Sequence, residues 1–240
     1  MLNILYADDY LALVDKPAGL LVHRTGLDAG ETRFALQMLR DQLGRPVWPV
    51  HRLDKGTSGV LLFALNAEVA RTLGRAFEQG HGLHKTYHAV VRGWSPDSGH
   101  IKHPLRRMPD DQRQGREEVQ PAETRFRTLV RYKLSLPQGP YTHTRCALVA
   151  LEPLTGRRHQ LRRHLKHTSH PIIGDATHGK GALNRALAAQ LGVQRLWLHA
   201  SELALAHPVT GAALRVVAPL GPEWSAWAPW ATPEGGPSNP

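Results

Sequence analysis

The sequence contains a single cysteine, Cys146, among 240 residues. One cysteine excludes an intramolecular disulfide and a zinc site built on cysteines. It also fits a reducing compartment, so we expect a cytoplasmic protein. Long apolar runs are lacking too, and Asp8, Asp9 and Asp15 interrupt the N-terminal segment. These features argue against a bilayer-spanning helix and against a secretory signal, so we expect no membrane partner.

Acidic residues are fewer than basic ones. There are 20 Asp and Glu against 30 Lys and Arg, which gives a formal net charge of +10. Residues 155–174 lack acids altogether, although they hold four histidines and five cationic side chains: Arg157, Arg158, Arg162, Arg163 and Lys166. Solvated surfaces usually mix both signs, so this stretch favours contact with phosphates. The charge pattern predicts a nucleic-acid partner, with a merely basic soluble surface as the alternative.

The chain also lacks an internal repeat, a dividing linker and a regular alternation of strands and helices. Its hydrophobic periodicity predicts helices at 31–43, 67–79, 159–167 and 182–191. It predicts a hairpin at 4–15 and strands at 47–53, 59–65, 85–91, 122–132, 144–151, 196–206 and 214–218. Residues 95–122 are polar and are expected to form a surface connection. The pattern is typical of an α+β fold with a mostly antiparallel sheet.

We expect one domain over residues 1–230 and a monomeric protein. Residues 231–240 are rich in Pro, Gly and Ser, and we expect them to form a disordered tail.

Several motifs of common enzymes are missing around Asp54, which lies in a Gly-rich turn between two expected strands. Residues 56–59 would form a nucleophile elbow only with glycine at position 60, where Val60 stands. The spacing of a phosphate-binding P-loop does not occur either, and no second motif supplies the other carboxylate of a glycosidase. From the residues alone, a turn-forming aspartate is the simpler interpretation of Asp54.

Five segments nevertheless resemble one known family when they are taken together and in order. Residues 51–59 read His-Arg-Leu-Asp-Lys-Gly-Thr-Ser-Gly, and residues 85–93 read Lys-Thr-Tyr-His-Ala-Val-Val-Arg-Gly. Residues 155–164 read Thr-Gly-Arg-Arg-His-Gln-Leu-Arg-Arg-His, and residues 170–175 and 198–200 complete the set. The set resembles the large-subunit rRNA pseudouridine synthase A family. The resemblance implies a single catalytic domain with a bent, mostly antiparallel sheet and flanking helices.

The resemblance also implies the reaction, in which the C–N glycosidic bond of a uridine is broken and the uracil is rejoined to the same sugar through carbon. This isomerisation has no net redox change, so we expect no cofactor and no metal. The resemblance makes Asp54 the catalytic carboxylate. It would act either as a nucleophile on the sugar C1′ or as a base that removes the 2′ proton, and the sequence does not separate these routes.

The same resemblance assigns partners to Asp54. Arg162 is expected to pair with it, with Arg157 as the next candidate, and Tyr87 is expected to stack on a flipped uracil. Arg52 is expected to flip or hold the target base. We expect further RNA contacts from His51, Arg157, Arg158, Arg163 and Lys166.

The histidines of the basic segment offer a conceivable metal site, because His164 and His167 would share a face of a helix. However, no acid or cysteine lies among them and the neighbouring arginines would repel a dication. We therefore expect these histidines to make phosphate contacts or local hydrogen bonds.

The expected partner is structured RNA. Shorter matches at 22–28 and 167–179 resemble the members that act on tRNA, and they predict uridine 65 of tRNA as the target. Large-subunit rRNA is the alternative substrate. An RNA-binding module with a decayed site and a glycosylase that uses the same aspartate are alternatives from other functional classes.

Overall fold

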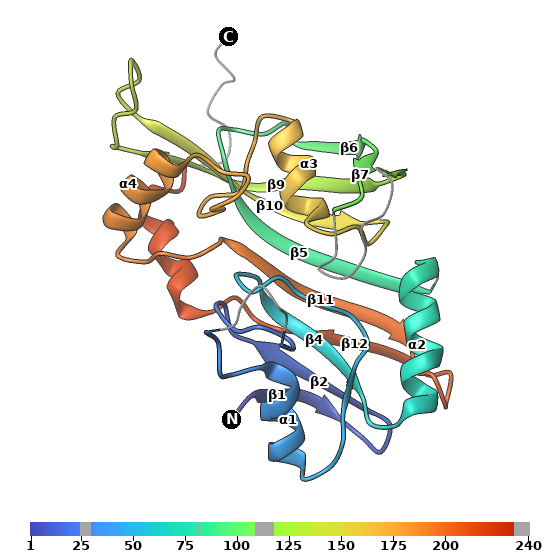
Figure 1. Cartoon of the computed structure of the whole chain (residues 1–240). Coiled ribbons are helices and arrows are strands. Elements are labelled where there is room, and N and C mark those ends of the chain that lie inside the picture. Colours follow the sequence, from blue (N-terminus) through green and yellow to red (C-terminus); the bar gives the residue numbers. More distant parts are fainter. Residues whose placement is uncertain (25–29, 81, 109–117, 233–240) are drawn as a thin grey trace.

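The computed structural model describes residues 1–24, 30–80, 82–108 and 118–232. Ten of its strands form one sheet, in the order β1-β2-β4-β11-β5-β10-β9-β6, with β3 paired to β4 and β12 paired to β11. Among these described strands, all pairs are antiparallel except β4 with β11. Figure 1 shows this sheet as a twisted surface with β1 and β2 near one end and β6 and β9 near the other. The predicted α+β class with a mostly antiparallel sheet is confirmed.

The strands cover all of the predicted extended segments at least in part. Their bounds are β1 (Asn3–Ala7), β2 (Leu11–Lys16), β3 (Trp48–Pro49), β4 (Ser58–Ala64), β5 (Leu83–Arg92), β6 (Ser98–Lys102), β7 (Leu105–Arg106), β8 (Val119–Gln120), β9 (Glu123–Leu134), β10 (Thr144–Pro153), β11 (Leu198–Ala206) and β12 (Ala213–Val217).

In the described ranges, four α-helices and one 3-10 helix accompany the sheet. Their bounds are α1 (Ala35–Leu43), α2 (Ala67–Gln79), α3 (Gln160–His167), α4 (Gly181–Leu191) and η1 (Pro222–Trp230). Helix α2 has the predicted bounds because both ends carry strong signals. The Asn66 side chain accepts a hydrogen bond of 2.8 Å from the backbone N–H of Val69, and Gly80 ends the helix in the left-handed conformation.

Helix α3 is fixed to the sheet by its apolar side chains. Leu161 and Leu165 are buried in one cluster with Ala147 and Val149 of β10. Figure 1 shows α3 lying against β9 and β10. Burial of two leucines contributes several kcal/mol, which holds the polar side chains of this helix in a fixed position relative to the sheet.

The prediction of a polar surface connection at 95–122 misses short strands, and residues 109–117 of this segment lie outside the described residues. Strand β6 pairs with β9, and β7 pairs with β8 in a separate two-stranded sheet. These strands are short and their exposed positions are polar, so the hydrophobic periodicity did not predict them. Ile101 of β6 and Leu105 of β7 are nevertheless buried. The segment predicted as extended at 47–53 contains only the two residues of β3 as strand.

Helix η1 was not predicted, and its tryptophans Trp224 and Trp227 pack edge-on against Trp197. The predicted disordered tail at 231–240 lies outside the described residues from position 233 onward. The limits of the expected domain at 1–230 therefore stay a prediction.

Gly59 allows the parallel contact between β4 and β11. Its φ angle is +108°, and a Cβ atom at this position would lie 2.1 Å from the carbonyl oxygen of Ala200. Only glycine fits so close to another backbone. The close approach fixes the start of β4, and with it the loop that carries Asp54.

Lys16 ties two loops together from inside the protein. Its residue exposure is 0%, and its ammonium group donates hydrogen bonds to the carbonyl oxygens of Pro17, Leu20 and Lys55, at 2.9, 2.7 and 3.3 Å. Burial lowers the pKa of Lys16 to about 7, although the charge of Asp54 opposes this effect. The contact with Lys55 joins the loop after β2 to the loop before β4.

We predict that Lys16→Met lowers the free energy of unfolding by roughly 3 kcal/mol, because three carbonyl groups in buried or partly buried contacts lose their donor. In the wild type, unfolding should take up one proton between pH 7 and the ordinary lysine value of 10.5. The free energy of unfolding should therefore rise with pH in this window, by at most about 1.4 kcal/mol per pH unit from this group. Denaturant unfolding at several pH values measures both effects.

The control is Lys133→Met, because Lys133 is an exposed lysine on β9. It should leave both the stability and its pH dependence close to those of the wild type. Equal pH dependence in the wild type and in Lys16→Met would contradict the shifted titration of Lys16.

Candidate active site

Asp54 lies in the loop between β3 and β4, directly after the buried Leu53. Its carbonyl oxygen accepts a hydrogen bond of 3.0 Å from the backbone N–H of Thr57, which closes a tight turn. The next carbonyl, that of Lys55, accepts from the backbone N–H of Gly19 at 2.8 Å. The backbone is thus held on both sides, while the side chain of Asp54 remains 30% exposed. The carboxylate is presented to solvent from a rigid turn.

Arg162 on α3 contacts Asp54 across 108 residues of sequence. Its Nη1 donates to Oδ2 of Asp54 at 2.9 Å, while Nε and Nη2 donate to the two oxygens of Asp175 at 2.7 and 2.8 Å. Burial acts against the charge of Arg162, but the bonds to Asp175 and Asp54 outweigh it and raise the pKa of the guanidinium. Arg162 therefore stays charged and links the two carboxylates.

Asp175 orients Arg162. Its side chain has no exposed surface, and its Oδ1 also accepts hydrogen bonds of 2.9 Å from the backbone N–H groups of Thr177 and His178. Burial alone would raise the pKa of Asp175, but the bonds from Arg162 and from these backbone groups lower it. Sequence reasoning assigned no role to Asp175; the only signal was its place at the end of the 170–175 motif.

His159 lies on the other side of the Asp54 carboxylate. Its Nε2 is 3.7 Å from Oδ1 of Asp54, and its Nδ1 is 3.3 Å from Nε2 of His178. His159 precedes α3 in the left-handed conformation, with φ of +53°, which points its ring toward the aspartate rather than along the helix. Burial lowers its pKa; the charge of Asp54 opposes this effect and that of Arg162 adds to it, so the net shift favours the neutral imidazole. Sequence reasoning expected only phosphate contacts or local bonds here.

Tyr87 is close enough to Asp54 to be affected by its charge. It lies on β5 between Leu151 of β10 and Ala200 of β11, and it packs against two apolar clusters of the core. Burial, with a smaller contribution from the charge of Asp54, raises the pKa of the Tyr87 phenol well above its usual value. The phenol is therefore protonated at neutral pH. The structure thus brings Asp54, Arg162 and Tyr87 to one place.

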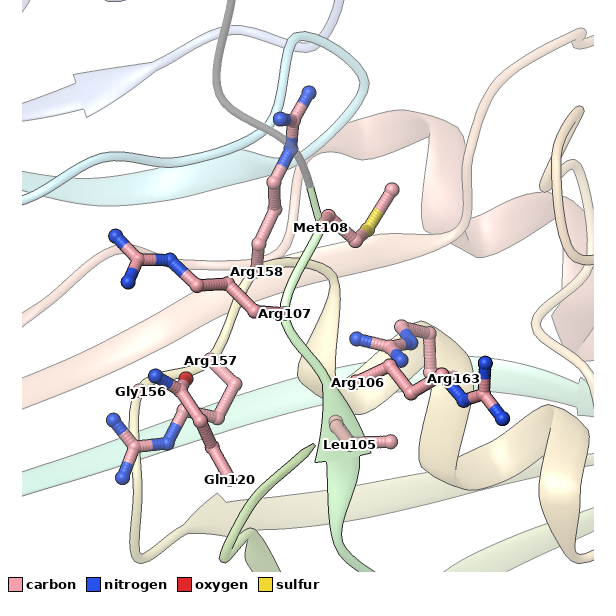
Figure 2. A pocket seen from close by; sticks show the side chains of 9 residues that line it. All are labelled: Leu105, Arg106, Arg107, Met108, Gln120, Gly156, Arg157, Arg158 and Arg163. Carbon is pink, nitrogen blue, oxygen red and sulfur yellow. The ribbon is translucent and has the colours of Figure 1, made fainter. Parts of the chain in front are cut away.

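Three of the predicted RNA contacts, Arg157, Arg158 and Arg163, line a pocket of about 250 Å³ (Figure 2). Arg106 of β7 and the next residue, Arg107, also line this pocket. Arg157 also donates to the carbonyl oxygen of Pro121 at 3.0 Å. Lys166 is exposed on α3 and does not line this pocket. Arg52, in the loop before Asp54, is also exposed and does not line the pocket.

His51 and His164 contact the protein itself. His51 stacks on Phe77 at 4.7 Å between ring centres and accepts a hydrogen bond of 3.1 Å from the backbone N–H of Leu62. Burial lowers the pKa of His51 to about 4. His51, expected to bind RNA, is thus engaged in packing between the sheet and α2. His164 bonds Thr124 and the carbonyl of His103, both at 2.9 Å.

No cluster of three or more histidine, cysteine, aspartate or glutamate side chains with the geometry to hold a metal ion occurs in the described part of the chain. Nor is any helix among the same residues long and apolar enough to cross a membrane.

The chain is similar in sequence and in structure to known proteins. A sequence model of the family described as RNA pseudouridylate synthase matches residues 10–167. A Vibrio cholerae protein called tRNA pseudouridine synthase C is 46% identical to this chain, and the match covers 93% of each chain. A Salmonella typhimurium protein of the same name is 49% identical, and the match covers 93% of this chain and 87% of that protein. The solved structure of human RNA pseudouridylate synthase domain containing 1 superposes with a TM-score of 0.73 and 28% identity, covering 96% of this chain and 88% of its own. The chain therefore belongs to the RNA pseudouridylate synthase family, whose members are enzymes that isomerise uridine within RNA.

Proposed function

We propose that this enzyme converts a uridine of tRNA to pseudouridine and that Asp54 is its catalytic carboxylate. The observation that carries the proposal is the hydrogen-bonded ion pair between Asp54 and Arg162 beside Tyr87. The tRNA substrate is supported by the relatives named tRNA pseudouridine synthase C, which are 46 and 49% identical to nearly the whole chain.

The two oxygens of Asp54 have different roles in this proposal. Arg162 holds Oδ2, which fixes the plane of the carboxylate. Oδ1 faces His159 and is the oxygen that we assign to the reaction. It attacks C1′ of the ribose, so that the bond from C1′ to N1 of uracil breaks and its electron pair leaves with the base. Alternatively, it removes the proton from C2′ as that same bond breaks; the geometry serves both routes.

Tyr87 supplies a flat ring on which the uracil stacks once it is out of the RNA helix. Because its pKa is raised, its hydroxyl acts at neutral pH as a hydrogen-bond donor rather than as a base. A donor next to uracil would stabilise the negative charge that develops on the base when the glycosidic bond breaks. In this proposal the phenol orients and stabilises the detached base while it turns.

Uridine 65 of tRNA is the target that we propose. A uridine in a stem must be unpaired before it can reach Asp54, which costs a few kcal/mol. The enzyme therefore needs a firm hold on the surrounding helix. Arg157, Arg158 and Arg163, which line one pocket, and the exposed Lys166 on α3 are the groups that we assign to this hold.

We predict that Asp54→Asn lowers the rate of pseudouridine formation by roughly three orders of magnitude, because an amide neither attacks C1′ nor removes a proton. RNA affinity should stay within about twofold, since many cations share the phosphate contacts. Mass spectrometry after chemical marking of pseudouridine measures the rate, and filter binding measures the affinity. Asp41→Asn, at an exposed aspartate of α1, is the control; near-normal turnover by Asp54→Asn would mean that another residue performs the chemistry.

Arg162→Lys should lower kcat roughly tenfold to a hundredfold although it keeps the positive charge. A planar guanidinium makes three hydrogen bonds to two carboxylates here, and an ammonium group does not reproduce this geometry. Single-turnover kinetics with saturating enzyme separates this effect from RNA binding. Arg157→Lys is the comparison variant, and a fully active Arg162→Lys beside an inactive Arg157→Lys would show that the roles are reversed.

Incubation of the enzyme with unmodified tRNA and with large-subunit rRNA fragments should give pseudouridine at position 65 of tRNA. The sites are mapped by chemical marking and primer extension, with the Asp54→Asn protein as the blank. Modification confined to rRNA would overturn the proposed substrate while leaving the proposed chemistry intact.

A further inference from the structure

His159 and His178 form a pair of imidazole rings beside Asp54. The rings meet edge to face, and Nδ1 of His159 lies 3.3 Å from Nε2 of His178. The other nitrogen of His159, Nε2, lies 3.7 Å from Oδ1 of Asp54. The pair therefore leads to the oxygen that is proposed to react, although none of the steps assigned above uses either ring.

The backbone around His159 holds its ring in this place. Its φ angle of +53° is rare outside glycine, and its side chain does not cap α3 although it precedes the helix. The next residue, Gln160, fixes the turn, because its Oε1 accepts hydrogen bonds from the backbone N–H of Arg157 and the hydroxyl of Thr155, at 3.0 and 2.6 Å. A backbone conformation that the surrounding structure enforces in this way is typical of functional positions.

Asp175 holds the pair from its other end. Its Oδ1 accepts hydrogen bonds from the backbone N–H of His178 at 2.9 Å and from Nη2 of Arg162 at 2.8 Å. One buried carboxylate thus acts on both oxygens of Asp54. It reaches Oδ2 through Arg162, and it reaches Oδ1 through His178 and His159.

The two distances indicate which nitrogen of His159 carries the hydrogen of the neutral ring. A hydrogen on Nε2 would be drawn to the anionic Oδ1 of Asp54, but 3.7 Å is longer than a hydrogen bond. Nδ1 is within 3.3 Å of His178, which can accept from it. We therefore assign the hydrogen to Nδ1. This leaves the lone pair of Nε2 directed at the reacting centre, where it can accept a proton.

The isomerisation needs a proton acceptor at this point. When the uracil is rejoined through C5, that carbon still carries its hydrogen, which must leave as a proton while N1 gains one. Arg162 keeps its charge and Tyr87 keeps its phenolic proton. Lys16 is fully buried and donates to three carbonyl oxygens. Among these described neighbours of Asp54, His159 is the one that offers a lone pair.

We propose that Nε2 of His159 removes the proton from C5 of the rejoined uracil and that His178 positions this imidazole. The electron pair of the C5–H bond becomes the C5–C6 double bond, and the pair of the C6–N1 double bond moves to N1. N1 then takes a proton from the imidazolium, so atoms and electrons balance. The proposal rests on the proposed function, because it takes Asp54 as the carboxylate that reacts at the sugar.

The reach of His159 suits this step. Reacting groups approach to about 3 to 3.5 Å, so a ribose C1′ at Oδ1 of Asp54 brings the C5 bonded to it close to Nε2 as well. Oδ1 itself is bonded to C1′ or holds the C2′ proton until the new bond forms. A second group is thus available for the C5 proton while Asp54 is still engaged.

The experiment compares hydrogen with deuterium at C5 in single turnovers with saturating enzyme. The RNA that the wild type modifies is transcribed with uridine or with 5-deuterouridine, and chemical marking of pseudouridine gives both rates. The variant is His159→Asn, because asparagine tolerates the left-handed backbone while its amide does not accept a proton. It should lower the rate roughly a hundredfold and make the deuterated RNA react about threefold more slowly than the other. The wild type should show a smaller isotope effect.

Further variants separate proton transfer from loss of structure. His159→Gly removes the ring without straining the backbone, and added imidazole should raise its rate about tenfold. His178→Gln keeps an acceptor for the Nδ1–H of His159 and should retain most of the rate. His178→Phe lacks this acceptor, and it should lose about tenfold in rate and show an increased isotope effect.

The structural control is His164→Ala. His164 is buried on α3, where it bonds Thr124 and the carbonyl of His103, both at 2.9 Å. Its loss should lower the free energy of unfolding, but it should neither increase the isotope effect nor make the rate respond to imidazole.

A wild-type rate in His159→Asn would overturn the proposal. So would a slow His159→Asn with the isotope effect of the wild type, together with a His159→Gly that imidazole does not rescue, because His159 would then serve the structure alone. Failure of the proposed function looks different, since Asp54→Asn would then stay active. If Asp54→Asn is inactive while His159→Asn is unaffected, only the role of His159 fails.

Discussion

The geometry of the site depends on one buried cation, Arg162, held between Asp54 and Asp175. Taking three charges out of water is costly, and close contact returns this cost only when the hydrogen bonds are well aligned. The bidentate contact with Asp175, whose Oδ1 also accepts hydrogen bonds from two backbone N–H groups, supplies that alignment. The third bond of the guanidinium is then directed at Asp54. The proposed catalytic carboxylate is thus positioned by a partner that is itself held by other groups.

This ion pair requires the rest of the fold to bring a sheet loop and a helix together. Gly59 lets β4 lie against β11 at the end of the Asp54 loop, and Lys16 holds the carbonyl of Lys55 from beneath. On the other side, Leu161 and Leu165 pack α3 against β10, which places Arg162 of the same helix next to the loop that carries Asp54. A helix that shifted by about one residue, or 1.5 Å, would separate the two charges. Apolar packing and backbone contacts therefore set the distance on which the proposed chemistry depends.

The sequence predicted the elements whose signals are local, such as α2 with its Asn66 cap and Gly80 stop. It also indicated, through the family motifs, that Asp54 and Arg162 belong together, and the structure places them at 2.9 Å. It did not reveal Asp175 as the second partner of Arg162, because nothing in the pattern shows which buried acid a distant arginine meets. Strands β6 to β8 were missed for a related reason: backbone pairing with distant segments, rather than side-chain periodicity, defines them.

Neutral groups lie next to Oδ1 of Asp54, the oxygen proposed to react, whereas the charged Arg162 binds Oδ2. Burial keeps the phenol of Tyr87 protonated and the imidazole of His159 neutral, so the groups next to Oδ1 carry no charge. The three charged groups of the ion-pair cluster sum to −1, whereas the described lining of the arginine pocket includes five arginines and no carboxylate. Phosphates are thus attracted to the pocket and repelled from the carboxylates, while an uncharged base and ribose meet neutral side chains. Under the proposed function, this field favours the orientation in which the backbone of RNA stays outside and the uridine turns toward Asp54.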